Sequence, residues 1–253
     1  MLEDYLRRQR KNRDILLMTH IVIGYPSLEA SYEIVRAMVA AGVDLMELQI
    51  PFSEPIADGP VILKASQEAL AGGVTVRQCI EFGARAAREF HIPFLFMTYY
   101  NILFKYGVER FVRTMGQNGM SGAIVPDLPP EEGATYLQAM SDERLDPIFI
   151  YAPTTSAKRM AEIARHARGF VYCVARKGVT GSQTAFSAEL ESYLTLCRQA
   201  VDLPLALGFG VKDRADIDFL TGKVDIAVIG TQTLRVVDEH GTAAVGDFIR
   251  GLR

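Results

Sequence analysis

The chain has 253 residues, of which 49% are hydrophobic and 23% are charged, and its formal net charge is −3. This is the composition of an ordinary globular protein, and the weak negative charge favours neither a nucleic-acid surface nor a polybasic membrane patch. No apolar run approaches the roughly 20 residues that cross a bilayer, and no signal-peptide pattern precedes the first apolar run.

Eight apolar runs suited to strands alternate with amphipathic segments suited to helices. Strands that are apolar throughout are typical of a parallel sheet buried on both faces. In chain order, the predicted strands cover residues 16–24, 44–50, 93–100, 122–126, 146–153, 169–175, 203–210 and 224–230, and the clearest helical segments cover residues 27–42, 109–119, 156–167 and 188–200. Eight βα repeats predict an α/β fold of the (β/α)8 TIM-barrel class. No linker interrupts the pattern, so we predict one domain over residues 1–253.

A doubly wound sheet is the alternative fold. Such a sheet normally carries a Gly-rich fingerprint after its first strand. The residues that follow Ile23 are GYPS, which do not form that fingerprint. The barrel is therefore the better prediction.

The segment between the second and third predicted strands, residues 51–92, is unusually long. It contains an extra predicted helix at residues 61–70 before the expected helix at residues 76–90. Long βα loops lie at the C-terminal face of a TIM barrel, where active sites form. We therefore expect functional residues in this segment.

Two carboxylates, Glu47 and Asp58, stand in the mostly apolar stretch MELQIPFSEPIADGP. Alternate side chains of a strand share a face, so we expect Glu47 and Gln49 to point into the barrel mouth. A buried, unpaired carboxylate tends to bind a proton, which suits a general acid. The structural alternatives are a pairing of Glu47 with a Lys or Arg, and a plain Asp-Gly turn at Asp58. The presence of both acids beside one long βα loop favours catalysis.

The loops after the last two predicted strands are candidates for phosphate binding. LGFGV contains Gly208 and Gly210, and IGTQT contains Gly230 and Thr231. These loops often bind phosphate in TIM barrels through backbone N–H groups and the start of a short helix. The alternative is plain turn chemistry at two strand ends. The preceding segment GVTGSQT, Gly178–Thr184, is predicted to be a lid with glycine hinges.

Other chemistries have weaker support in the sequence. None of the seven lysines lies within a predicted strand, as a Schiff-base aldolase requires, although Lys177 and Lys212 lie in loops near the mouth. The four histidines are scattered, and we predict no metal site. The cysteines are odd in number, widely spaced and set in apolar surroundings, so we expect reduced thiols in a cytoplasmic protein; they are Cys79, Cys173 and Cys197. Acid–base chemistry on a phosphorylated small molecule remains.

Seven sequence blocks follow one another between residues 18 and 237. They are ELxIPFSEPIADGP, MTYYN, VPDLP, APTT, GFVYxVxRxGVTG, GFGV and the final IGT. In order and spacing they are similar to those of the tryptophan synthase α subunit family. The resemblance implies a TIM barrel without a cofactor of its own that cleaves indole-3-glycerol phosphate to indole and glyceraldehyde 3-phosphate. It also implies an α2β2 assembly with a β subunit, which contains pyridoxal phosphate and receives the indole through a tunnel.

By the same resemblance, the family's two catalytic acids fall on Glu47 and Asp58. Glu47 would give a proton to the indole carbon that loses its side chain and then take the proton of the side-chain hydroxyl. Asp58 would bind the indole N–H. The PFSEP segment would face the β subunit. The family's substrate-binding positions fall on Met97, Ile124, Tyr172, Thr180, Gly181, Phe209, Gly210, Gly230 and Thr231.

Six residues depart from the family pattern, and three of them bear on activity or on binding of the partner. Gln49 stands where the family usually has Gly, and a larger amide there would narrow the pocket or hydrogen-bond Glu47. His20 replaces an aromatic or bulky apolar residue, and Glu54 replaces an Asp. Two alternatives therefore stay open. One is a catalytically weakened chain that mainly binds and activates a β subunit, and the other is a barrel lyase for another phosphorylated substrate.

Overall fold

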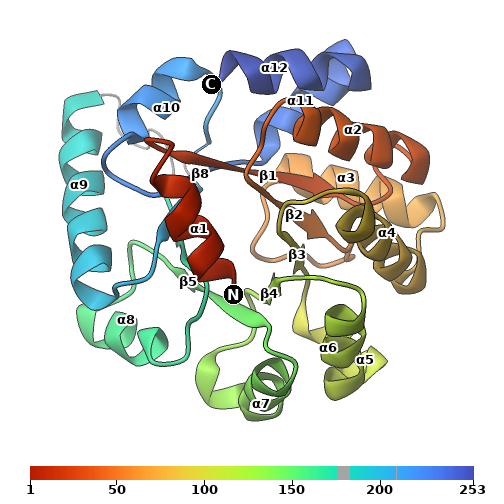
Figure 1. The fold of residues 1–253 in the computed structure, drawn as a ribbon, viewed down its shortest axis with the longest axis horizontal. Coiled ribbons are helices and arrows are strands. Elements are labelled where there is room, and N and C mark those ends of the chain that lie inside the picture. The colour runs from red at the N-terminus through yellow and green to blue at the C-terminus, as the bar shows by residue number, and fades with distance from the viewer. Residues whose placement is uncertain (176–182, 209) are drawn as a thin grey trace.

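The computed structural model is a closed barrel of parallel strands surrounded by helices (Figure 1). It describes residues 1–175, 183–208 and 210–253, without the side chains of residues 183–188. Within these residues, eight strands pair in chain order from β1 to β8, and β8 pairs with β1 to close the sheet. The predicted TIM-barrel class is therefore confirmed.

Each of the eight strands lies inside one of the predicted apolar runs. Their bounds are β1 (Leu16–Val22), β2 (Leu45–Gln49), β3 (Phe94–Met97), β4 (Gly122–Ile124), β5 (Asp146–Tyr151), β6 (Val171–Val174), β7 (Leu205–Gly208) and β8 (Ile226–Ile229). The predicted third strand was too long, because a helix begins at Tyr100. Its backbone N–H donates to the carboxylate of Asp127 at 2.9 Å, which satisfies a donor that a helix start leaves unpaired.

The helices lie outside the sheet, and most of them form a ring around it (Figure 1). Their bounds are α1 (Leu2–Arg10), α2 (Leu28–Ala40), α3 (Pro60–Ala71), α4 (Val76–Glu89), α5 (Tyr100–Tyr106), α6 (Val108–Gln117), α7 (Ala134–Asp142), α8 (Ala157–Ala164), α9 (Gln183–Ala200), α10 (Arg214–Leu220), α11 (Thr231–His240) and α12 (Val245–Gly251). Two short 3-10 turns cover Pro130–Glu132 and Thr242–Ala244.

The long segment between β2 and β3 folds as its sequence predicts. The extra helix is α3, which has Pro60 in its first turn, a position that suits the fixed φ of proline. The expected helix is α4. It begins with a capping box, in which Thr75 and Gln78 each bind the other's backbone N–H group. The segment thus places a structured loop beside the carboxyl end of β2.

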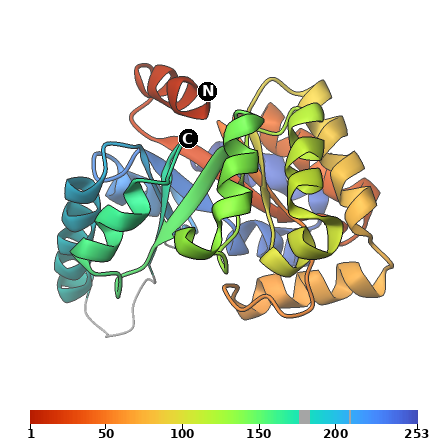
Figure 2. The same cartoon turned by 90° about the horizontal axis from the view of Figure 1, so that it is seen from below.

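The apolar core has two layers, one between strands and helices and one inside the barrel. The inner layer contains Leu45 of β2, so the alternation of a strand also turns Glu47 and Gln49 inward. Leu2 and Leu6 of α1 join this inner layer. Helix α1 therefore covers one end of the barrel, while α3 lies near the opposite end (Figure 2).

None of the helices described in this structure has the length and apolar character needed to cross a bilayer.

Candidate active site

A cavity of about 220 Å³ opens at the carboxyl ends of the strands. Glu47 and Asp58 both line it, so the structure brings the two acids together. Six of the predicted substrate-binding residues line the same cavity, namely Met97, Ile124, Tyr172, Gly210, Gly230 and Thr231. The other three, Thr180, Gly181 and Phe209, lie outside the described residues, as does most of the predicted lid.

Glu47 enters the cavity from β2 and is paired with a histidine. Its neighbour across the β1–β2 register is His20, and His20 Nδ1 lies 2.6 Å from Glu47 Oε1. Both residues are buried, with exposed fractions of 2% for His20 and 4% for Glu47. The outer atoms of the pair, His20 Nε2 and Glu47 Oε2, are buried and have no hydrogen-bond partner among the described residues. The partner of Glu47 is thus neither a Lys nor an Arg.

Asp58 lies in the loop before α3, and two hydrogen-bond donors hold its side chain. Its Oδ2 atom accepts hydrogen bonds from Gln49 Nε2 at 2.7 Å and from the Tyr99 hydroxyl at 2.9 Å. The Tyr99 oxygen in turn accepts a hydrogen bond from the backbone N–H of Ala57 at 3.2 Å. The ring of Phe52 stacks on that of Tyr99, with the ring centroids 5.1 Å apart. Asp58 is therefore not merely a turn residue, because its side chain is held in one place.

Gln49 was predicted to narrow the pocket or to hydrogen-bond Glu47, and the structure shows neither effect. It is fully buried, but its amide binds Asp58 rather than Glu47, and it is not part of the cavity wall. The predicted hydrogen bond to Glu47 is wrong because the amide nitrogen of Gln49 donates to Asp58, while His20 engages one oxygen of Glu47 from β1. The cavity between the two acids stays open beside this larger residue.

The two acids change the protonation of their neighbours. Burial alone lowers the pKa of His20, but the hydrogen bond and charge of Glu47, with the charge of Asp58, raise that pKa above its ordinary value of 6.5. Burial raises the pKa of Tyr172 well above 10, and the charges of Glu47 and Asp58 add to this rise. The cavity thus holds a neutral phenol opposite the acid pair at any ordinary pH.

The wall away from the acids is built from glycines and the start of α11. Gly210 has a φ of +76°, which favours glycine, and Gly230 directly precedes Thr231, the first residue of α11. A Cβ atom on Gly208 would lie 3.0 Å from the Tyr172 hydroxyl oxygen, so a glycine there makes room for the phenol. Exposed backbone N–H groups at a helix start suit an anionic ligand group.

Comparison with known proteins assigns the chain to a family. The sequence profile described as tryptophan synthase alpha chain matches residues 6–248, which is nearly the whole chain. The chain belongs to this family. It is 64% identical to the tryptophan synthase alpha chain of Syntrophotalea carbinolica and 63% identical to that of Desulforapulum autotrophicum, and both matches cover 100% of each chain.

Solved structures of the tryptophan synthase family share the fold. Tryptophan synthase from Mycobacterium tuberculosis has a TM-score of 0.91 and 32% sequence identity, with 99% of this chain and 96% of that chain covered. The tryptophan synthase alpha subunit from Legionella pneumophila has a TM-score of 0.90 and 28% identity over the same shares of the two chains. The resemblance stated from the motifs is therefore confirmed.

Two site features of this family member were not predicted from the sequence. Tyr99 lies in the block MTYYN, which signalled a functional position without saying that its hydroxyl binds Asp58. The contact of His20 with Glu47 depends on strand pairing across 27 residues. A search for polar residues at inward positions of neighbouring strands would have found it.

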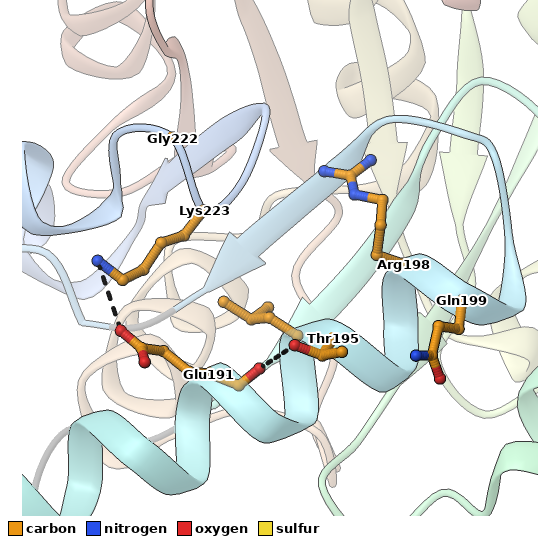
Figure 3. Close-up of a pocket in the computed structure, with 7 residues that line it drawn as sticks. Glu191, Thr195, Arg198, Gln199, Gly222 and Lys223 are labelled. Atoms are coloured by element: carbon orange, nitrogen blue, oxygen red, sulfur yellow. Dashed lines mark hydrogen bonds and ion pairs between the residues drawn. The ribbon is translucent and has the colours of Figure 1, made fainter.

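A further cavity, of about 500 Å³, lies between α9 and the turn before β8 (Figure 3). Two cations face it, and both are engaged. Lys223 Nζ lies 3.8 Å from Glu191 Oε1, and Arg198 Nη2 lies 2.7 Å from Asp225 Oδ2. Because Lys223 precedes β8, this cavity is at the amino ends of the strands, away from the two acids.

Proposed function

We propose that Glu47 and Asp58 carry out acid–base cleavage of a carbon–carbon bond in the cavity at the barrel mouth. As a member of the tryptophan synthase alpha chain family, the chain cleaves indole-3-glycerol phosphate to indole and glyceraldehyde 3-phosphate. The observation that carries the residue roles is the meeting of two fixed carboxylates on one cavity, with Glu47 Oε2 unpaired.

The cleavage needs one proton given and one proton taken. Glu47 gives a proton to the indole carbon that bears the side chain, which places positive charge on the ring nitrogen. Asp58 accepts a hydrogen bond from the indole N–H and stabilises the positive charge on the ring. Glu47 then takes the proton of the side-chain hydroxyl, the carbon–carbon bond breaks, and its electrons return to the ring. The hydroxyl carbon leaves as the aldehyde of glyceraldehyde 3-phosphate.

The rest of the cavity suits the two ends of this substrate. Met97 and Ile124 offer an apolar wall for the indole ring beside the acids. Gly210, Gly230 and Thr231 offer backbone N–H groups for the phosphate. We assign Thr180, Gly181 and Phe209 to substrate binding by their motif positions alone.

The chain pairs with a tryptophan synthase β subunit, and pyridoxal phosphate belongs to that subunit rather than to this chain. The exposed apolar residues Ile56 and Phe104, with exposed fractions of 82% and 65%, support a docking surface on the PFSEP loop and α5. We propose an α2β2 assembly that works in the cytoplasm. We also propose one domain over residues 1–253, because closure of the barrel requires the first and last strands together.

The assignment of roles is tested by indole release from Glu47→Gln and Asp58→Asn variants, with and without a β subunit. We expect kcat to fall by about 100-fold or more in each, which is typical for loss of an acid–base group. Glu109→Gln, at an exposed carboxylate on α6, is the matched control. Turnover in either site variant equal to that of the control would refute the role of that residue.

The main prediction, a catalytic alpha chain, is the one that the relatives support, rather than a weakened activator or a lyase for another substrate. Relatives that are 56% to 64% identical over the full chain carry the name of the catalytic subunit. The departures at His20 and Gln49 leave both acids on the cavity.

A further inference from the structure

The proposed lyase reaction needs the carboxyl group of Glu47 but does not by itself require a contact between Glu47 and His20. The two side chains are buried, and their ring nitrogen and carboxylate oxygen lie 2.6 Å apart. A histidine placed there only to fill space would not need a charged partner. In this pair the two atoms without a partner, Nε2 and Oε2, belong to residues that line the substrate cavity.

We propose that His20 is a positioning residue of the lyase reaction, which holds Glu47 through Nδ1 and shares with it the proton that the reaction transfers. The inference rests on the proposed function and adds a second group to its acid. One carboxylate oxygen is engaged by His20, and the other, Oε2, is left without a partner among the described residues. The reacting acid of this chain is then a His20–Glu47 pair rather than a lone carboxylic acid.

The protons balance within the pair. At the start the pair holds two exchangeable protons, one on His20 Nε2 and one in the Nδ1–Oε1 hydrogen bond. Glu47 takes the Nδ1 proton as it gives a proton to the indole carbon, and the pair is left with the proton on Nε2. Glu47 then takes the proton of the side-chain hydroxyl as the carbon–carbon bond breaks. The pair ends with two protons again, so no other donor or acceptor is needed.

The surroundings of the pair favour this proton store. Among the described residues that line the cavity, the titratable groups other than the pair are Asp58 from the loop after β2 and Tyr172 from β6. Tyr172 stays neutral, and Gly230 and Thr231 at the end of β8 carry no charge. The net charge facing His20 is therefore negative, which favours the protonated imidazole and agrees with its raised pKa.

The first test is the pH profile of kcat/KM for indole release from the complex with a β subunit. His20→Phe removes the proton store while supplying an aromatic residue of the kind usual in the family. His20→Asn keeps a donor to Glu47 Oε1 but cannot store the proton. We expect the alkaline limb to move to lower pH by about one unit in both variants. We also expect His20→Asn to retain more activity than His20→Phe at about pH 6.

His91→Phe, at an exposed histidine, is the matched control and should keep the wild-type profile. An alkaline limb that stays in place in both His20 variants would overturn the proposal. A thermal melt of each variant distinguishes lost folding from lost chemistry.

The second test does not depend on activity. The nitrogen-15 NMR signals of His20 are assigned by their absence in His20→Asn. Both ring nitrogens of His20 should be protonated at about pH 6, below the raised pKa of the imidazole. In Glu47→Gln the titration midpoint of His20 should fall below that of the wild type, because the charge of Glu47 that raises it is lost. Equal midpoints in the two proteins would refute the pair. A wild type with this titration but without lyase activity would instead refute the proposed function.

Discussion

Each of the two carboxylates at the barrel mouth is held by a buried polar side chain from a strand. His20 binds Glu47 from β1, and Gln49 binds Asp58 from β2. Both donors are buried, so each hydrogen bond forms in a low-dielectric setting where it fixes geometry strongly. His20 and Gln49 therefore act on the acids themselves rather than on the distant walls of the cavity.

Replacement of Gln49 by Ala should weaken catalysis without abolishing it. Asp58 Oδ2 would lose the amide donor at 2.7 Å but keep the Tyr99 hydroxyl at 2.9 Å. Loss of one hydrogen bond to a charged group costs about 1.5 to 3 kcal/mol. We expect kcat/KM for indole release to fall by about 10-fold to 100-fold, by the usual conversion of free energy into rate.

The control for this prediction is Gln138→Ala, at an exposed glutamine on α7. An unchanged kcat/KM in Gln49→Ala would mean that Tyr99 alone positions Asp58. A loss as large as that of Asp58→Asn would mean that the amide also contacts the substrate.

At this scale the sequence predicted which residues meet but not how they are bonded. Strand alternation placed Glu47 inside the barrel, and the motifs pointed to Asp58 and to the opposite wall. The bond from His20 to Glu47 depends on the pairing of β1 with β2, and that from Tyr99 to Asp58 spans 41 residues. A single sequence does not give side-chain partners at such separations.

Helix α1 is the element that closes the amino end of the barrel (Figure 2). Leu2 and Leu6 pack into the inner core, and Leu2 also donates its backbone N–H to Asp146 Oδ2 at 3.1 Å. The basic residues that follow in this helix, Arg7 and Arg8, are exposed, as expected for a solvated helix end. The apolar face of a nine-residue helix thus completes the core.

Replacement of Leu6 by Ala should destabilise the whole barrel. Leu6 is fully buried, and loss of a buried leucine side chain costs about 2 to 5 kcal/mol because a cavity remains. We expect this loss in the free energy of unfolding from urea titration. Arg8→Ala, on the exposed face of the same helix, should change it by about 0.5 kcal/mol or less. Equal, small effects in both variants would show that α1 is dispensable for stability.

The order of the elements was predictable because the strands are mostly apolar and most turns are marked by Gly, Pro or a polar cap. The residues at which the elements begin and end were less predictable. Residues 98–100 continue the predicted strand, yet Tyr99 stands at the N-cap position of α5. The competing signal, a hydrogen bond from Tyr100 to Asp127, comes from the next βα loop. Local composition therefore gave the strand, and a contact distant in sequence ended it.

At the scale of the whole molecule, barrel closure buries many phenol groups. In eight tyrosines the pKa is raised, and burial is the largest cause in each. In Tyr32 the hydrogen bond to Glu89 at 2.8 Å adds to the effect of burial, and the pKa rises to about 12. Eight of the ten tyrosines have a raised pKa, namely Tyr5, Tyr25, Tyr32, Tyr99, Tyr136, Tyr151, Tyr172 and Tyr193. The folded protein thus keeps protons that the unfolded chain releases.

The consequence is a loss of stability at alkaline pH. Above about pH 10 the unfolded chain loses its phenolic protons while the folded protein retains them, so the free energy of unfolding falls as pH rises. For Tyr32 this window runs from 10 to about 12. We expect phenolate absorbance to lag behind that of free tyrosine and then to rise together with unfolding. Tyr32→Phe should remove one phenol from the absorbance that appears late in the titration. It should also make the free energy of unfolding fall less steeply as pH rises. Titration of all ten tyrosines near pH 10 in the folded protein would contradict the burial on which this prediction depends.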